Sequence, residues 1–170
     1  TAQPFRLTNI RGKRRNPGLQ KQHLACVRAA AEITDAKTTG AKMLSPELTF
    51  QPGPIRPGDY HFDIASAGSA TLVAQTILPA LFTAAAPSLV TITGGTHNPF
   101  APPFDFLAEV FLPAIARMNF RFAAELRRHG FFPAGGGEIA LRITPWRREL
   151  AKPLDWTDPP PDLDWSARIY

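Results

Sequence analysis

A basic turn near the start of the chain is the clearest candidate for chemistry. It covers residues 11–18 and carries Arg11 and Arg14, and Gln22 and His23 follow on a predicted helix. Arginine offers forked donors that match phosphate oxygens, and the amides at a helix N-terminus add partial positive charge. The pattern predicts a phosphate-binding site. A solvated basic loop beside a half-packed histidine is the alternative, and composition alone favours that plainer interpretation.

A second candidate lies where a predicted strand passes into a predicted helix. Residues 66–69 read Ser-Ala-Gly-Ser, and a glycine there permits close approach of a ligand to the backbone at a helix start suited to anions. The turn lacks the lysine and spacing of a Walker sequence, so a plain helix cap is the alternative. Gln75 follows on an otherwise apolar helix, where its amide either bonds local backbone or contacts the edge of a ligand.

A third candidate is the loop at residues 94–103, which includes Pro102. It follows the carboxyl end of a predicted strand, where ligands often bind in α/β sheets, and a rigid turn is the alternative. His97 and His129 are far in sequence from paired acidic residues, and no H-x-x-x-H, C-x-x-C or G-x-S-x-G arrangement occurs. Zinc chemistry and Ser-His-Asp catalysis are therefore not supported.

Short elements joined by tight turns must position these candidates. Apolar alternation and helical spacing of apolar residues distinguish the strands from the helices. The predicted strands cover residues 5–10, 37–41, 47–51, 60–65, 89–93, 120–126 and 138–143, and the predicted helices cover residues 17–34, 69–81 and 102–118. We expect Pro113 to kink the third helix, whose apolar face should carry Leu107, Val110, Phe111, Ile115 and Met118.

This order of elements predicts an α+β fold with α/β-like repeats, in which helices pack on mixed sheets. The run from residue 69 to residue 144 resembles a complete unit, and the run from residue 5 to residue 65 resembles the same unit without its first helix. From Trp146 the pattern decays towards a proline run at residues 159–161. The prediction is one repeat domain at residues 1–145 and a linker or edge excursion at residues 146–170.

Composition narrows the class of protein. A chain of 170 residues suits one domain, and its 18 prolines and 12 glycines exclude a helical bundle. The net charge is +5, and seven lysines and arginines precede the first acidic residue, Glu32, which suits an anionic partner. The single cysteine fits a reducing compartment. The most apolar window, residues 72–86, is too short for a membrane span, and no signal peptide is recognisable, so we expect a cytoplasmic protein.

Four segments, taken in order, resemble RNA 3′-terminal phosphate cyclases. They read IRGKRRNPGLQKQHL, FDIASAGSATLVAQTILPALF, TGGTHNPFAPPFDFL and RHGFFPAGGGE, and the resemblance spans residues 3–143. The family's fold repeats a unit of two helices on a four-stranded sheet, in agreement with the duplicated unit above. The resemblance implies that the first unit here lacks its initial strand and helix. It also implies that residues 146–170 are a linker or the start of a small inserted domain.

The resemblance implies chemistry on RNA ends. In this family ATP adenylates a histidine, the AMP passes to an RNA 3′-phosphate, and the neighbouring 2′-hydroxyl expels AMP to leave a 2′,3′-cyclic phosphate. By resemblance, the RNA phosphate side is formed by Arg11, Arg14, Gln22 and His23. Gln75 resembles the glutamine that contacts the nucleotide. Pro102 resembles a proline that packs against adenine, which makes physical sense because its ring is a flat apolar face.

The family's nucleophile has no counterpart here, because His23, His61, His97 and His129 all lie outside the matching context. The resemblance therefore implies a partial cyclase that is inactive alone. It implies ATP as the cofactor, a divalent metal (Mg or Mn) whose ligands lie outside this chain, and RNA with a 3′-terminal phosphate as the partner, with no membrane involved.

Two other functions stay open. One is a catalytically inactive cyclase-like protein that binds RNA or acts in ribosome assembly. The other is a carboxyvinyl transferase relative with a similar repeated fold and small anionic substrates. The Ser-Ala-Gly-Ser turn, Gln75 and residues 101–103 favour the enzyme, since a scaffold has no physical need for an adenine platform.

Overall fold

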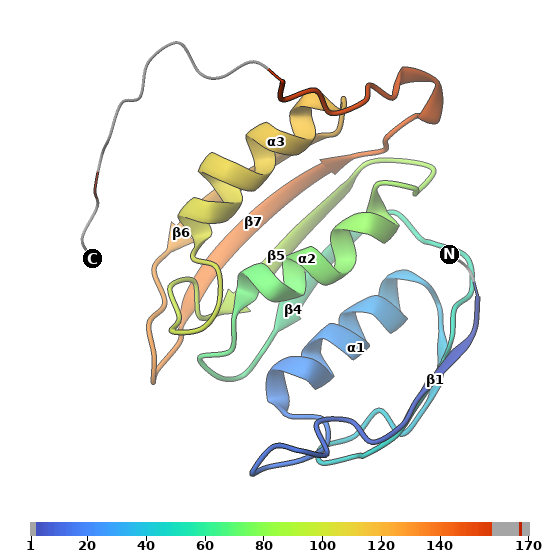
Figure 1. The fold of residues 1–170 in the computed structure, drawn as a ribbon, viewed down its shortest axis with the longest axis vertical. Coiled ribbons are helices and arrows are strands. Elements are labelled where there is room, and N and C mark those ends of the chain that lie inside the picture. Colours follow the sequence, from blue (N-terminus) through green and yellow to red (C-terminus); the bar gives the residue numbers. More distant parts are fainter. Residues whose placement is uncertain (1–2, 158–166, 168–170) are drawn as a thin grey trace.

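The computed structural model describes residues 3–157 and 167, and it has the predicted α+β architecture (Figure 1). The strands are β1 (Phe5–Leu7), β2 (Lys37–Thr39), β3 (Leu48–Gln51), β4 (Asp59–Asp63), β5 (Ser88–Gly94), β6 (Arg121–Arg128) and β7 (Gly137–Thr144). The helices are α1 (Lys21–Ile33), α2 (Ala70–Leu81) and α3 (Leu112–Arg117), with a π-helical segment at Phe106–Phe111 and a short 3-10 helix at Arg148–Leu150.

Two sheets share one pattern of connections. The smaller sheet is antiparallel with the order β1-β3-β2, and the larger is mixed with the order β4-β5-β7-β6. β1, α1, β2 and β3 follow one another along the chain as β5, α3, β6 and β7 do, and in both sets the last strand lies between the other two. The described strands therefore contain the last part of the unit twice.

The assignment of the strand at residues 60–65 to the first unit is wrong. β4 pairs in parallel with β5, and α2 forms the crossover between them. A parallel pair needs such a long connection, whereas antiparallel strands can be joined by a tight turn. β4 therefore begins the second unit, which has two helices and a four-stranded sheet.

The core lies around α2, which packs against α1 and against the larger sheet. Its wide apolar stripe is buried as predicted, with Val73, Ala74 and Ile77 fully enclosed. In Figure 1 the three helices lie over one face of the larger sheet, while the smaller sheet lies beside α1. This packing fixes the start of α2, around which the candidate residues gather.

The first helix begins four residues later than predicted, at Lys21 instead of Pro17. Residues 17–20 form an irregular segment because their backbone bonds to other loops: Gly18 N donates to Ile10 O, and Leu19 N donates to Ser45 O. Gly18 has φ +77, and a Cβ there would lie 2.3 Å from Leu44 O. Only glycine fits this close crossing of two chain segments.

The third helix is distorted before Pro113 by the π-helical segment, in which Leu112 N bonds to Leu107 O. Proline has no N–H to donate to the preceding turn, and a π turn is one way to absorb that loss. The wider turn rotates the apolar face, so Val110 is 52% exposed while Leu107 is buried. The prediction that Val110 shares the buried face is therefore wrong.

The chain after β7 stays in contact with the core at its second residue, Trp146. The Trp146 indole stacks on Phe120 with ring centroids 4.7 Å apart, and its Nε1 donates to Met118 O. The proline run at residues 159–161 lies outside the described residues. No described helix has the length and apolar character needed to cross a bilayer.

Candidate functional site

The two arginines of the basic turn are held differently. The Arg11 guanidinium donates through Nη1 to Asn16 O and, at 3.3 Å, to Gly18 O. Arg11 also has φ +54, so it closes the turn from within. Arg14 is exposed, and its side chain forms no hydrogen bond to another described residue. Arg14 is thus the cation of this pair that a ligand can reach most easily.

His23 lies in the first turn of α1, because the helix begins at Lys21 and not at Pro17. The Gln20 backbone N–H donates to His23 Nδ1 at 3.3 Å, so Nε2 carries the proton of the neutral ring. Partial burial lowers the pKa of His23, and the positive charge of Arg11 lowers it further. The structure therefore brings His23 beside Arg11 in the neutral form, with an N–H to offer.

The start of α2 is not an open anion cradle. Ser69 N donates to Gln22 Oε1 at 2.9 Å, Ala70 N donates to Gly95 O at 2.8 Å, and Leu72 N donates to Ser69 Oγ at 3.2 Å. The expected anion-binding geometry at residues 66–69 is wrong, because the protein itself occupies these amides. Ser69 acts as the helix cap, the plainer of the two interpretations.

Gln22 is accordingly a bridge between helices. Its Oε1 atom accepts the Ser69 N–H, 47 residues away in the sequence, and links the start of α1 to the start of α2. The same α2 start bonds to Gly95, the first residue after β5. The start of α1, which directly follows the basic turn, and the loop that carries Pro102 are thus joined through the first residues of α2.

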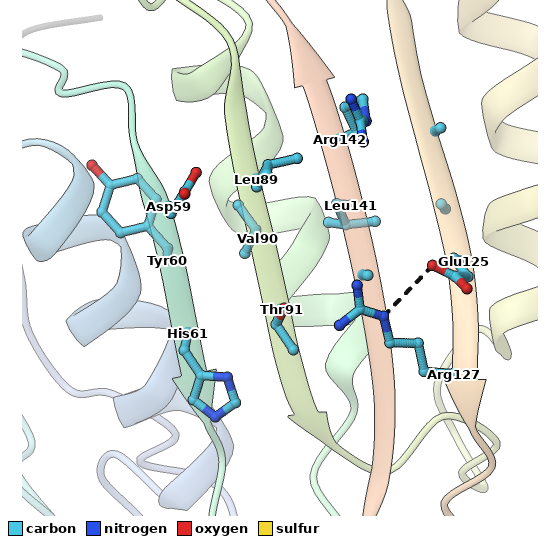
Figure 2. A pocket seen from close by; sticks show the side chains of 13 residues that line it. Asp59, Tyr60, His61, Leu89, Val90, Thr91, Glu125, Arg127, Leu141 and Arg142 are labelled. Atoms are coloured by element: carbon cyan, nitrogen blue, oxygen red, sulfur yellow. Dashed lines mark ion pairs between the residues drawn. The ribbon is translucent and has the colours of Figure 1, made fainter.

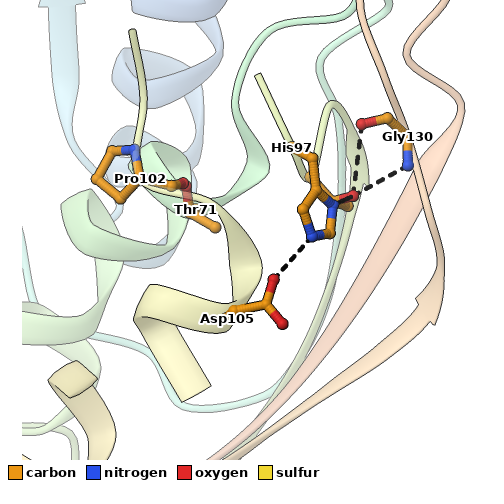
Figure 3. Close-up of polar contacts among 6 residues, drawn as sticks. Thr71, His97, Pro102, Asp105 and Gly130 are labelled. Atoms are coloured by element: carbon orange, nitrogen blue, oxygen red, sulfur yellow. Dashed lines mark hydrogen bonds and ion pairs between the residues drawn. The ribbon is translucent and has the colours of Figure 1, made fainter. Parts of the chain in front are cut away.

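The two nucleotide-side candidates lie along one side of α2. Thr71 Oγ1 donates to Pro102 O at 2.7 Å (Figure 3). Gln75 is one helical turn beyond Thr71. Gln75 is half-buried, and its side-chain amide forms no hydrogen bond with another described residue. It borders an apolar groove of about 630 Å³ between α2 and the third helix, lined also by Phe82, Phe106 and Phe111. Local backbone bonding, one of the two interpretations of Gln75, is not observed.

The loop after β5 is held by a buried histidine. His97 Nε2 lies 2.8 Å from Asp105 Oδ2, and Nδ1 lies 2.8 Å from Thr96 Oγ1 (Figure 3). The His97 side chain is 8% exposed and stacks on His129 with ring centroids 5.2 Å apart. Thr96 Oγ1 in turn accepts the Gly130 N–H. These contacts span both ends of the loop and leave it little freedom.

The glycine-rich segment after Phe131 reaches the same place. Gly135 has φ +74, and a Cβ there would lie 2.8 Å from Ser66 O and 2.9 Å from Ala67 Cα. Asn98 Nδ2 also donates to Ala67 O. The four segments quoted above for their resemblance therefore meet around the turn at residues 66–69.

A separate hollow of about 460 Å³ lies on the larger sheet, on the face opposite the helices (Figure 2). Its polar rim mixes both charges, with Asp59 and Glu125 beside Arg127 and Arg142. None of the six candidate residues lines it. A mixed rim gives no preference for an anion, so we place the candidate site at the start of α2.

Metal-ligating side chains do not cluster in the described part of the chain, where no group of three His, Cys, Asp or Glu could hold an ion. The described residues therefore offer no three-ligand protein site for a divalent metal.

Sequence reasoning missed the polar residues that join these segments. Thr71 is fully buried and Asp105 bonds His97, yet neither was a candidate. A threonine within an apolar helical stripe, two residues after the cap, is a signal that could have pointed to Thr71. The pairing of His97 with Asp105 depends on the path of the loop and leaves no local pattern.

Comparisons with known proteins agree with the resemblance. A family profile described as "RNA 3'-terminal phosphate cyclase" matches residues 1–156. The chain is 52% identical over 161 residues to the "RNA 3'-terminal phosphate cyclase" of Ectopseudomonas mendocina (strain ymp), covering 95% of this chain and 46% of that protein. It is 55% identical over 145 residues to the protein of the same name from Pseudomonas fluorescens, covering 85% of this chain and 42% of that protein. The chain spans less than half the length of these curated relatives.

Proposed function

Because this chain belongs to the RNA 3′-terminal phosphate cyclase family, we propose that the protein carrying it converts an RNA 3′-phosphate into a 2′,3′-cyclic phosphate at the expense of ATP. A histidine outside these residues attacks the α-phosphate of ATP and releases pyrophosphate. The RNA 3′-phosphate then takes the AMP from that histidine. Finally the adjacent 2′-hydroxyl attacks the activated phosphate, loses its proton and expels AMP.

In this proposal the described residues bind RNA and ATP, and the covalent AMP adduct forms on the histidine outside them. Arg14 and the neutral His23 would donate to oxygens of the RNA 3′-phosphate, while Arg11 shapes the turn that presents them. Gln75 would donate to or accept from the nucleotide, and the Pro102 ring would pack against adenine. Each role places a donor or a flat apolar face where its ligand needs one.

One observation carries the proposal: the start of α1, which directly follows the basic turn, and the Pro102 loop are joined through the start of α2. The bonds from Ser69 to Gln22 and from Ala70 to Gly95 fix this arrangement. Transfer of AMP to an RNA end requires both substrates at one place, because positioning reactants supplies much of the rate of a two-substrate reaction. A protein that only bound RNA would have no need to hold a nucleotide-side loop there.

Labelled ATP tests the proposal. A full-length protein carrying this segment, incubated with ATP labelled at the α-phosphate, should form a covalent AMP adduct and should cyclise RNA that ends in a 3′-phosphate but not in a 3′-hydroxyl. The 170-residue chain alone should form no adduct, since its four histidines lie outside the nucleophile context. RNA binding without any adduct in the full-length protein would instead support the inactive RNA-binding relative.

The Gln75→Ala variant separates the nucleotide side from the RNA side. Loss of a hydrogen bond that leaves a buried partner unsatisfied costs about 1 to 3 kcal/mol, so adenylation efficiency should fall roughly 5- to 150-fold with RNA binding retained. A lowered melting temperature with unchanged adenylation would return Gln75 to a purely structural role.

A further inference from the structure

The start of α2 contains a chain of buried hydroxyl groups that ends on the Pro102 loop. Ser69 is 2% exposed and Thr71 is 0% exposed. Ser69 Oγ and Thr71 Oγ1 lie 2.7 Å apart, and Thr71 Oγ1 lies 2.7 Å from Pro102 O. These contacts connect the helix to the loop across 31 residues of sequence.

The direction of each bond follows from counting protons. A carbonyl oxygen cannot donate, so the single hydroxyl proton of Thr71 goes to Pro102 O. Ser69 must then donate its own proton to Thr71 Oγ1, and Ser69 Oγ accepts the Leu72 N–H with a lone pair. Gln22 completes the set by accepting the Ser69 N–H. The Ser69 and Thr71 hydroxyl protons thus each have one acceptor, so the Thr71 hydroxyl has one favoured orientation.

The bond to Pro102 O anchors the carbonyl that is attached to the ring-bearing residue. The pyrrolidine ring already fixes φ of Pro102, and Pro103 fixes its own φ in the same way. Because Pro103 follows, ψ of Pro102 is confined to the extended region as well, so the carbonyl and the ring turn nearly as one unit. Because Thr71 holds that carbonyl, it also holds the direction in which the Pro102 ring faces (Figure 3).

We infer that Thr71 is a positioning residue for the nucleotide: its hydroxyl, oriented by Ser69, sets the Pro102 ring that packs against adenine. This inference rests on the proposed function for the identity of the nucleotide. A proline ring packs against a base without forming hydrogen bonds to its edge. Thr71 should therefore affect the affinity for the nucleotide and not the chemical step.

Three variants test the inference in a full-length protein carrying this segment. Thr71→Val keeps the shape and removes both hydroxyl bonds, and Thr71→Ser keeps the hydroxyl. Thr76→Val is the matched control, since Thr76 is exposed on the same helix and its hydroxyl donates to Leu72 O, away from the Pro102 loop. In self-adenylation, Thr71→Val should raise KM for ATP about 5- to 10-fold with kcat within twofold of the parent protein, while Thr71→Ser and Thr76→Val match the parent.

A second readout needs no activity. In the 170-residue chain, amide hydrogen exchange at Ala101 and Phe104, which flank the two prolines, should be faster in Thr71→Val than in Thr76→Val. Unchanged exchange there, unchanged KM, or a Thr71→Ser variant as impaired as Thr71→Val would each overturn the inference. If the unmutated full-length protein forms no AMP adduct, the proposed function fails. If it forms the adduct and Thr71→Val leaves KM unchanged, only this inference fails.

Discussion

The connection from β1 to α1 and the connection from β5 to α3 have the same place in the three-strand pattern that both sheets contain. Different kinds of side-chain contact hold them in place. In the first, the Arg11 guanidinium closes the turn on backbone carbonyls, and Arg14 remains exposed. In the second, the buried side chain of His97 bonds the half-buried side chain of Asp105.

The difference indicates a division of labour between the two connections. The first keeps charged donors accessible, which suits a mobile polyanion that arrives from solvent. In the second connection, Thr96, His97 and Asp105 bond one another. This connection therefore holds the Pro102 ring on a fixed backbone. Substitutions in the first connection should therefore mainly slow the transfer of AMP to RNA. Substitutions in the second should mainly lower the free energy of unfolding.

The largest expected effect is at Arg14. In a full-length protein carrying this segment, Arg14→Ala should slow AMP transfer from the pre-adenylated enzyme to an RNA 3′-phosphate by roughly 10- to 150-fold, because hydrogen bonds to charged groups are worth about 1.5 to 3 kcal/mol. Self-adenylation by ATP should not change. Arg14→Lys should restore transfer only partly, because an ammonium lacks the forked donors. Single-turnover kinetics measures each step.

Lys13 and Arg15 are the matched controls, since both are exposed on the same turn. Their replacement by alanine should weaken RNA binding in a salt-dependent way without changing the preference for a 3′-phosphate over a 3′-hydroxyl. Equal losses in all the variants, with that preference intact, would make the turn a general basic patch and remove Arg14 from the site.

The second connection should respond through stability. His97→Phe keeps a ring that can stack on His129 but leaves Asp105 and Thr96 without their bonds to the imidazole. Unfolding of the 170-residue chain in urea should show a loss of about 1 to 2 kcal/mol. Phe131→Leu, which changes an exposed member of the same stack, should cost less. A His97→Phe protein as stable as the parent would show that the imidazole bonds do not hold this loop.

Periodicity was sufficient to predict the strands and helices, because apolar alternation and helical spacing report burial directly. It failed where contacts distant in sequence decide the structure. The start of α1 is delayed by the crossing of Gly18 over Leu44, and β4 joins the second sheet through its parallel pairing with β5.

The same limit applies to the site: Gln22 was recognisable by resemblance, but its bond to Ser69 depends on two helices meeting. The roles of the six candidate residues remain predictions.

Arg11 should produce a smaller and mixed effect. Because its guanidinium bonds Asn16 O and Gly18 O, Arg11→Ala should cost about 1 kcal/mol of stability and should also slow AMP transfer, by less than Arg14→Ala does. Urea unfolding and single-turnover transfer together separate the two contributions. A transfer defect larger than that of Arg14→Ala, at unchanged stability, would exchange the roles of the two arginines.

The smallest effect concerns the protonation of His23. Burial first, and the charge of Arg11 second, lower the pKa of this histidine, so the folded chain holds fewer protons there than the unfolded chain at mildly acidic pH. The stability that this difference contributes is complete above the ordinary histidine pKa and is lost as the pH falls through that value towards the lower folded pKa. Arg11→Ala should therefore raise the pKa of His23 part of the way to the ordinary value, leaving the effect of burial. An NMR titration of the His23 ring protons measures this, with Arg14→Ala as the control that should leave the titration unchanged. An equal rise in both variants would mean that the whole basic turn, and not Arg11 in particular, sets the charge state beside the predicted phosphate site.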